Sequence, residues 1–565
     1  SNSNSNSSSS SSSSNFVRQC TEGTDLTFPL CAVCLPGWQK SGVGPCVQCT
    51  ASNHAVQTIA VFGILVFIVI FIIILKTKMK RQLRRVKSLY LDVLRIMSIT
   101  ISFYQIATSL TTTAPTVPWP QDLVKYYDAF QFINIDVLDM AGIACGTRVT
   151  HADKLYFSTV TIFALIFAGI GTYMFIRFKQ ESALQSAIKN GELLQVWKIA
   201  LEKGFDLIDN DESNSVDAVE LTELLEIVHS HEHEQDAKAL ARQFGEGKSG
   251  KMKRATDESN GLILASGKGG TMSRAQFVES MLTHPVFNSS EEQQVNLVRW
   301  TNHVAAYTGS MGSPAQLAFI VHAPISKTAF QWLNCRWVGN RAYVQADFGT
   351  ECYTEAYNRT TVLAILVILL FSLGLPLLLG VCLYRSRETL HTPRVKARIG
   401  WLYSRYNVGC EWWQLHELAR KLLLCSVLMF VSPNALRMPV AVIICIVAIV
   451  NLNFFHPQRN KYVFKVAEIA FCSSAIQMVC GLSLKAAEGN EEWSNSVGIM
   501  MVALDVLTLL AVVAAVLLLL IFLKSKIATV DNHHKVLASK KGRSTKVKHV
   551  DGDGDGEISL EVIKN

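Results

Sequence analysis

Residues 361–383 read TVLAILVILLFSLGLPLLLGVCL and contain no charged side chain. A helix needs about 20 predominantly apolar residues to cross a bilayer, so this stretch predicts a transmembrane helix. The sequence that follows it, YRSRETLHTPRVKAR at 384–398, is rich in Arg and Lys. Because cytoplasmic loops carry an excess of basic residues, this helix is predicted to end in the cytosol.

The composition of the whole chain agrees with a membrane protein. Of its 565 residues, 17% are charged, whereas soluble domains carry about 25%. Several other long apolar runs cannot lie in water, which excludes a wholly soluble enzyme. The net charge of +8 comes from basic residues beside these runs, so no nucleic-acid partner is expected. The sequence contains no nucleophile–base pair, phosphate-binding loop or metal-hydrolase motif, so an enzyme is not expected either.

The same hydropathy argument predicts nine helical spans. Only helices and closed barrels cross bilayers, and these runs lack the alternation of barrel strands, so the fold class is mainly α: a polytopic helical membrane protein. The basic sequence KTKMKRQLRRVK follows the first span. It places the N-terminus outside and the C-terminus in the cytosol, with the plasma membrane as the expected location. The predicted spans are 56–75, 89–110, 155–176, 295–322, 361–383, 415–431, 438–455, 462–484 and 497–523.

The span at 295–322 is predicted by parity rather than by hydropathy, since it contains one arginine and two histidines. The spans at 155–176 and 361–383 both end in basic sequence, so the chain must cross outward between them. Pro376, inside the second of these spans, is expected to kink it. A neighbouring helix is expected to satisfy the carbonyl group that this proline frees.

The outward crossing places three chemically informative residues outside the cell. Cys335 and Cys352 lie in the resulting external loop, where a disulfide between them is expected. Asn358 begins the sequon Asn-Arg-Thr in the same loop and is a glycosylation candidate.

A cluster of cysteines precedes the first span. Its sequence, CTEGTDLTFPLCAVCLPGWQKSGVGPCVQC, contains C-x₂-C pairs, which occur both in zinc sites and in disulfide modules. An external position, Gly/Pro-rich spacing and the lack of His favour disulfides. The stretch resembles the last repeat of an ephrin-receptor-like, growth-factor-like cysteine-rich ectodomain. An extracellular ligand of this module is therefore a predicted partner.

The sharpest motif lies in the polar insert between the third and fourth spans, where DNDESNSVDAVE at 209–220 matches an EF-hand calcium-binding loop. Such a loop needs oxygen ligands at positions 1, 3, 5, 7, 9 and 12. Val216 stands at position 8, where it is expected to pair with a neighbouring loop. A solvated acidic helix–loop–helix is the alternative. The predicted Ca²⁺ ligands are Asp209, Asp211, Ser213, Ser215 through its backbone carbonyl, Asp217 and Glu220.

Two further loops resemble EF-hands but are incomplete. In the first, Met272 takes position 8 and Gln276 takes position 12, and acidic ligands are missing, so this loop is expected to pack against the first without binding Ca²⁺. The second, DGDGDGEISLEV near the C-terminus, has Val562 at position 12. It is a weaker site, or an acidic and partly disordered tail. Its candidate ligands are Asp551, Asp553, Asp555 and Glu557.

Charged residues inside the spans are candidates for an ion path. Asp505 lies in the last span, Glu468 in the eighth, and Glu417, Arg420 and Lys421 at the start of the sixth. The alternative is that they pair with each other or reach the membrane interface.

These observations divide the chain into six parts. They are a Ser/Asn-rich tract at 1–15, an extracellular cysteine-rich module at 16–55, spans one to three at 56–176, a cytosolic EF-hand pair at 177–290, spans four to nine at 291–523, and a cytosolic basic tail with an incomplete loop at 524–565.

Several motifs together resemble a known family. They are FINIDVLDMAGIAC, SKTAFQWLNCRWVGNRAYVQADFGTEC, LLFSLGLPLLL and IGWLYSRYN followed by CEWWQLHELARKLLL. They resemble the transmembrane region of large cysteine-rich membrane proteins of protists and algae, which is similar to the fungal transient-receptor-potential-like channel domain. The resemblance covers residues 125–176 and 295–484, and the calcium-binding insert departs from the fungal pattern. It implies a multi-span helical cation channel with a cysteine-rich ectodomain.

The sequence therefore predicts a calcium-regulated, transient-receptor-potential-like ion channel. The alternative is a receptor-like or scaffold membrane protein with a calcium-sensing cytosolic domain. A solute transporter is disfavoured because no inverted repeat is evident. The expected partners are the lipid bilayer, Ca²⁺ and an extracellular ligand, and the sequence leaves homo-oligomerisation open.

Overall fold

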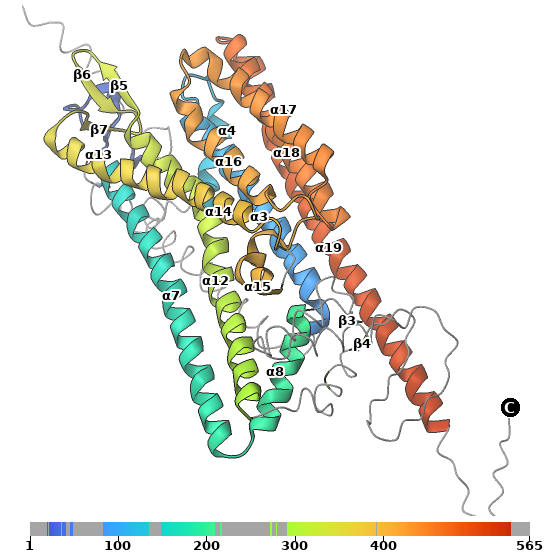
Figure 1. Cartoon of the computed structure of the whole chain (residues 1–565). Coiled ribbons are helices and arrows are strands. Elements are labelled where there is room, and N and C mark those ends of the chain that lie inside the picture. The colour runs from blue at the N-terminus through green and yellow to red at the C-terminus, as the bar shows by residue number, and fades with distance from the viewer. Residues whose placement is uncertain are drawn as a thin grey trace, which may run out of the picture.

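The computed structural model describes the helical part of the chain and several short segments. The described residues are 20, 22–35, 37–40, 46–48, 83–134, 149–208, 215–216, 272–273, 278, 291–390 and 393–543. Within them the protein is mainly helical, with three small antiparallel sheets (Figure 1).

Six of the helical segments are long and apolar enough to cross a membrane. By helix length and hydropathy, the chain is therefore a multi-pass membrane protein. The segments are Asp92–Thr113 within α3 (Leu83–Thr113), α7 (His151–Lys189), Glu355–Arg385, Asn434–Phe455, α18 (Lys461–Ala486) and Glu491–Ile521 within α19 (Glu491–Arg543). The segment Glu355–Arg385 consists of α13 (Glu355–Val367), the π-helix η4 (Ile368–Leu373) and α14 (Gly374–Arg385), and Asn434–Phe455 consists of η6 (Asn434–Leu436) and α17 (Arg437–Phe455).

Three of the nine predicted spans do not correspond to any of these six segments. The span at 56–75 lies outside the described residues. The span at 295–322 lies within α12 (Glu291–Trp332), a helix of 42 residues. Because of its polar side chains, α12 is not among the six membrane-length apolar segments. The prediction of one continuous helix over 415–431 is wrong: α16 (Trp413–Cys425) ends after 13 residues, and the 3₁₀ turn η5 (Val427–Phe430) follows. Thirteen helical residues extend about 20 Å, less than the hydrocarbon thickness of a bilayer.

The long helices form a bundle (Figure 1). At one side of it, α7 and α12 run antiparallel to each other, and this pair is called the α7–α12 hairpin. α7 packs along α12 at one side, and α3, α16, α17, α18 and α19 pack together at the other. One buried cluster contains side chains from all five of these helices, among them Leu110, Leu424, Met438, Met478 and Met501. Large side chains of α7, such as Phe163, Phe167 and Phe175, are exposed, as expected of a lipid-facing helix.

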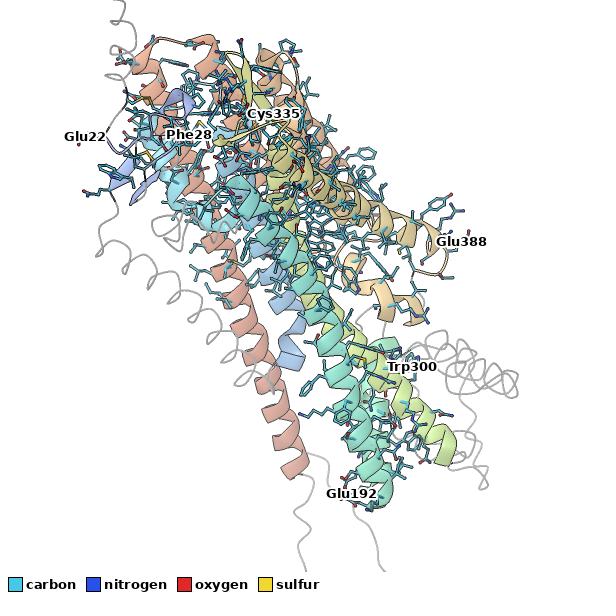
Figure 2. All side chains as sticks on the ribbon, turned by 90° about the vertical axis from the view of Figure 1, so that its left-hand side faces the viewer. Glu22, Phe28, Glu192, Trp300, Cys335 and Glu388 are labelled. Atoms are coloured by element: carbon cyan, nitrogen blue, oxygen red, sulfur yellow. A yellow bond between two sulfur atoms is a disulfide. The ribbon has the colours of Figure 1, made fainter. Side chains whose placement is uncertain are left out.

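Shorter elements occupy the two ends of the bundle. α4 (Gln121–Ala129) packs against α3 and α19, and η2 (Gln131–Asn134) follows it. α8 (Leu193–Ile208) folds back onto α12, and α15 (Pro393–Tyr403) contacts both of these helices. The turn between α7 and α8 near Glu192 marks the end opposite Cys335 (Figure 2).

A three-stranded sheet connects α12 to α13. Its strands are β5 (Cys335–Val338), β6 (Arg341–Val344) and β7 (Asp347–Glu351), in the order β5-β6-β7. Val338 pairs with Arg341, so a two-residue turn joins the first two strands, and Gly339 adopts a φ of 62° in it. Such tight hairpin turns require left-handed conformations, which glycine adopts without a steric penalty.

The cysteine-rich N-terminal module is bonded by disulfides. Cys20 bonds to Cys31 and Cys34 to Cys46, which confirms disulfides rather than zinc at these four positions. The module contains η1 (Pro29–Cys31) and the hairpin of β1 (Trp38–Lys40) and β2 (Cys46–Gln48). Both overall views place it at the end of the molecule that carries β5–β7 (Figures 1 and 2).

Candidate functional site

The predicted calcium-binding insert contains a short antiparallel pairing between its two loops. β3 (Ser215–Val216) pairs with β4 (Met272–Ser273), with Ser215 opposite Ser273 and Val216 opposite Met272. Val216 and Met272 are the residues that the sequence placed at position 8 of each loop. The register therefore joins the two loops at equivalent positions, although 55 residues lie between β3 and β4.

Of the six predicted Ca²⁺ ligands, only Ser215 lies among the described residues. Its predicted ligand atom is the backbone carbonyl, which belongs to β3. The other five, Asp209, Asp211, Ser213, Asp217 and Glu220, lie outside the described residues, and so do the weaker candidates Asp551, Asp553, Asp555 and Glu557. In the described part of the chain, no group of three or more His, Cys, Asp or Glu side chains has the arrangement of a metal site.

The insert is attached directly to the α7–α12 hairpin. α8 ends at Ile208, immediately before the first loop, and buries Trp197, Leu201 and Phe205. Further along the hairpin, the Tyr173 hydroxyl lies 3.0 Å from Nδ1 of His303. α8 therefore connects the first loop to the packed pair of α7 and α12.

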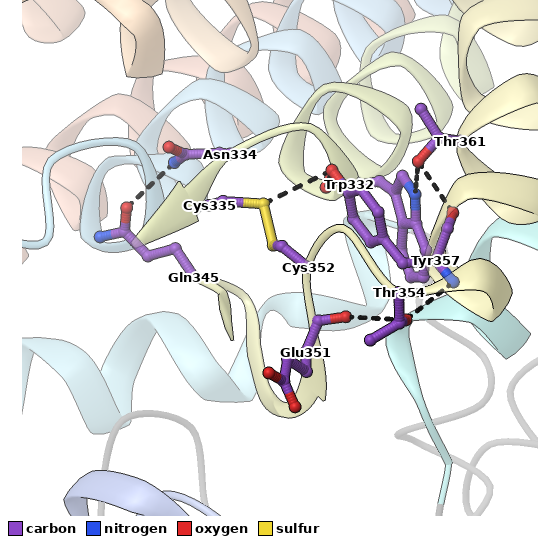
Figure 3. The surroundings of a disulfide bond; sticks show 9 residues. All are labelled: Trp332, Asn334, Cys335, Gln345, Glu351, Cys352, Thr354, Tyr357 and Thr361. Atoms are coloured by element: carbon purple, nitrogen blue, oxygen red, sulfur yellow. Dashed lines mark hydrogen bonds between the residues drawn. A yellow bond between two sulfur atoms is a disulfide. The ribbon is translucent and has the colours of Figure 1, made fainter. Parts of the chain in front are cut away.

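The sheet at the other end of α12 is closed by a disulfide between Cys335 and Cys352 (Figure 3). The Tyr357 hydroxyl lies 3.4 Å from Sγ of Cys335 and donates a 3.3 Å hydrogen bond to the Trp332 carbonyl. The Trp332 indole in turn donates to Oγ1 of Thr361 at 3.0 Å. These bonds fasten the sheet to the end of α12 and the start of α13.

An aromatic stack extends this cap to α7. The ring of Trp332 lies between His151 and Tyr357, with centroid distances of 6.2 and 5.1 Å and interplanar angles of 10° and 16°. The backbone N–H of His151 also donates to the Asp347 carboxylate in β7 at 3.2 Å. The cap therefore holds together the start of α7, the end of α12 and the start of α13.

The glycosylation candidate Asn358 lies in the first turn of α13 and is exposed. Residue 358 is therefore helical and not part of a loop as expected, because Thr354 caps the helix by accepting from the backbone N–H of Tyr357 at 3.2 Å. Thr360, the third residue of the sequon, is buried.

The charged residues of α16 are partnered, and of them Arg420 and Lys421 are buried whereas Glu417 is partly exposed. Arg420 forms a 3.0 Å ion pair with Glu417, and its guanidinium lies 3.9 Å from the centroid of the Phe471 ring. Lys421 donates a 2.9 Å hydrogen bond to the carbonyl of Phe319 in α12. Pairing, the alternative to an ion path, is thus present for Arg420 and Glu417.

Helix α12 also makes polar contacts with α3 and η4. Its Ile320 carbonyl accepts from the Gln105 side chain of α3 at 2.9 Å. His322, which has no exposed surface, lies with Nε2 3.0 Å from the Ser372 carbonyl of η4. Pro376 cannot donate to the Ser372 carbonyl four residues earlier. The partner expected from a neighbouring helix for that carbonyl is thus present.

The segment between α14 and α16 is also well packed. The Tyr403 hydroxyl donates to the Leu390 carbonyl, and burial, reinforced by the negative charge of Glu411, raises the pKa of Tyr403 to about 12. The Tyr406 hydroxyl donates a 2.9 Å hydrogen bond to Oε1 of Gln414. Tyr403 and Trp413, which carry much of the family resemblance, are therefore buried residues of the folded core.

The last two spans share a second polar site. Asp505 in α19 has no exposed surface, and its Oδ1 accepts a 2.5 Å hydrogen bond from the Gln477 amide of α18. The remaining candidate, Glu468, instead forms a 2.6 Å pair with Lys465 in a more exposed position. Gln477 is a residue of this site that the sequence motifs do not single out, although an uncharged amide inside an apolar helix is a signal of a buried polar contact.

The chain matches no protein-family model, and comparisons with curated proteins and with solved structures give no significant match. The family resemblance described above therefore rests on the quoted motifs alone.

Proposed function

We propose that this protein is a Ca²⁺-regulated, transient-receptor-potential-like cation channel in the plasma membrane, with its N-terminus outside and its C-terminus in the cytosol. The observation that supports calcium binding is the pairing of Val216 with Met272. In an EF-hand pair, backbone pairing joins the two calcium loops at position 8 of each, which is the pairing that Val216 and Met272 make.

The proposed site binds one Ca²⁺ ion in the first loop. Asp209, Asp211, Ser213, Asp217 and Glu220 supply side-chain oxygens, and Ser215 supplies its carbonyl. The second loop has Gln276 in place of the closing glutamate and acts as a structural partner. With a complete ligand set in only one loop, affinity is expected in the sensor range of about 10⁻⁷–10⁻⁵ M.

The distribution of cysteines supports the proposed orientation. The disulfides Cys20–Cys31, Cys34–Cys46 and Cys335–Cys352 all lie toward one end of the molecule. Disulfides persist on the oxidising side of a membrane. Among the described residues, the six remaining cysteines are unpaired and none lies in α7, α8 or α12. The insert beyond α8 then faces the reducing cytosol, where Ca²⁺ signals occur.

The proposed coupling runs through α12. Ca²⁺ binding changes the loop pair, α8 transmits the change to the α7–α12 hairpin, and α12 bears directly on Lys421, Gln105 and Ser372 of neighbouring helices. A ligand shifts such an equilibrium only by its differential affinity for two packings. The buried polar contacts of α12 are discrete, so they can separate two such packings.

The test uses the full chain in planar lipid bilayers. We expect a cation conductance that changes with cytosolic Ca²⁺, and loss of that Ca²⁺ response in Glu220→Gln, which weakens the bidentate closing ligand. Gln276→Ala is the matched control and should leave the response unchanged. Absence of conductance at every Ca²⁺ concentration would contradict the channel. Ca²⁺ titration calorimetry in which Glu220→Gln binds as tightly as the wild type would contradict the site.

The second candidate is a receptor-like or scaffold protein with the same calcium-sensing insert. The disulfide-bonded N-terminal module favours it, because Leu26, Leu30 and Leu35 expose 56%, 49% and 41% of their surface there. Exposed apolar side chains on a rigid module are typical of a protein-binding surface. Ca²⁺ binding without conductance, together with an extracellular ligand lost on Leu30→Asp, would favour this function over the channel.

A further inference from the structure

Asp505 is a carboxylate buried in the middle of the last membrane-length segment. It is the fifteenth residue of the 31-residue apolar segment Glu491–Ile521, and its side chain has no exposed surface. Oδ1 accepts from Gln477, whereas Oδ2 has no hydrogen-bond partner among the described residues. A buried polar atom without a partner is costly, and a buried charge more so.

No cationic side chain of the described residues forms an ion pair with Asp505. The groups that interact with its carboxylate are neutral: the amide of Gln477 and the hydroxyl of Tyr127 in α4. The Tyr104 hydroxyl of α3 donates to its backbone carbonyl at 3.3 Å. This contrasts with Glu417 and Glu468, which both have basic partners within the same helix.

The surroundings offer oxygen atoms from several helices. Oε1 of Gln477 is also buried and unpartnered in the described part of the chain, and the Gln477 amide lies 3.4 Å from the Tyr127 hydroxyl. On the same two helices, the hydroxyls of Ser473 and Thr508 are buried and lie 2.8 Å apart. A carboxylate with neutral carboxamide and hydroxyl oxygens is a donor set for hard cations.

We propose that Asp505 and Gln477 form a binding site for one monovalent alkali cation, Na⁺ or K⁺, in the interior of the bundle. Oδ2 of Asp505 and Oε1 of Gln477 are the ligands, and the Tyr127 hydroxyl orients the carboxylate. One carboxylate neutralises one monovalent charge. A divalent ion would leave a net positive charge in a medium of low dielectric, where an uncompensated charge is strongly unfavourable.

This site is separate from the calcium loop and does not depend on the proposed function. Asp505 belongs to α19 and Gln477 to α18, whereas the loop pair is attached to α8 and α12. Occupancy is a property of the folded protein whether or not the protein conducts ions. Binding is therefore measured on detergent-solubilised protein, and a negative result would leave the Ca²⁺-dependent conductance untouched.

The test measures the thermal unfolding midpoint of the purified full chain at constant ionic strength and saturating Ca²⁺. NaCl or KCl replaces choline chloride stepwise. We expect the midpoint to rise and saturate with Na⁺ or K⁺ and not with choline. Asp505→Asn, which keeps the shape and removes the charge, should abolish the shift. Glu468→Gln removes a charge from α18 outside the site and should retain the shift.

A second variant keeps the proposal falsifiable should Asp505→Asn not fold. Gln477→Leu removes one ligand and retains the carboxylate, so the half-saturating cation concentration should rise at least tenfold. Equal midpoints in Na⁺, K⁺ and choline would overturn the proposal. So would a midpoint that rises as the pH falls but ignores the cation, since Asp505 would then be a protonated acid.

Discussion

Nε2 of His322 lies 3.0 Å from the carbonyl oxygen of Ser372, four residues before Pro376. A carbonyl oxygen only accepts, so this ring nitrogen carries the proton. Pro376 has no N–H to donate to that carbonyl. A polar side chain of α12 therefore supplies the hydrogen bond that the proline of the next span cannot make, at the end of the π-helix η4 (Ile368–Leu373).

His322→Leu should lower the free energy of unfolding by about 1–3 kcal/mol, because it removes the partner of a buried polar group. In a Pro376→Ala background the same substitution should cost less, since residue 376 can then donate its own N–H. Denaturant unfolding in detergent, followed by tryptophan fluorescence, measures both values. His303→Leu is the control: it removes an exposed contact with the Tyr173 hydroxyl on the same helix pair and should cost less. Equal costs in the two backgrounds would show that the two donors do not share the carbonyl.

Glu417→Gln should destabilise the protein by about 3–5 kcal/mol, because it leaves the buried Arg420 guanidinium without its counter-charge. The double variant Glu417→Gln/Arg420→Met should recover most of this loss, since an apolar side chain of similar length needs no partner. Glu355→Gln breaks the exposed pair with Arg359 and should cost less than about 1 kcal/mol. A double variant as unstable as the single one would instead assign Arg420 a role beyond this pair.

Replacing both cysteines of the cap, Cys335→Ala/Cys352→Ala, should lower stability by about 3 kcal/mol, because the bond closes a loop of this size in the unfolded chain. The sequence separation is 17 residues. The unfolding midpoint under oxidising conditions measures the effect. Cys382→Ala removes a half-buried cysteine that forms no disulfide within the described part of the chain and serves as the control. A double variant as stable as the wild type would mean that the His151–Trp332–Tyr357 stack holds the cap alone.

Asn358 should carry a glycan if residues 333–360 face the cell exterior. The chain contains two other sequons, at Asn6 and Asn288, and the proposed topology places Asn288 in the cytosol. In an Asn6→Gln background, Asn358→Gln should therefore abolish the glycosidase-sensitive shift in gel mobility, whereas Asn288→Gln should not alter it. A glycan at Asn288 would reverse the orientation of the insert and exclude it as a cytosolic calcium sensor.

Features that depend on short stretches of chain could be read from the sequence. A run of about 20 apolar residues is a local property, and six of the nine predicted spans correspond to helices of membrane-spanning length. The pairing of Val216 with Met272 also followed from local register, because each loop numbers its own positions. The cysteine-rich module was predictable because its closely spaced cysteines bond to near neighbours.

The tertiary structure decided which polar side chains meet. His322 and Ser372 are 50 residues apart, Lys421 and Phe319 are 102 apart, and Gln477 and Asp505 are 28 apart. Spans that are apolar on every side carry no pattern that sets their rotation, since lipid solvates all faces of such a helix equally. The packing of neighbouring helices sets that rotation, so the partners of Asp505 and the end of α16 at Cys425 appear only when the helices are assembled.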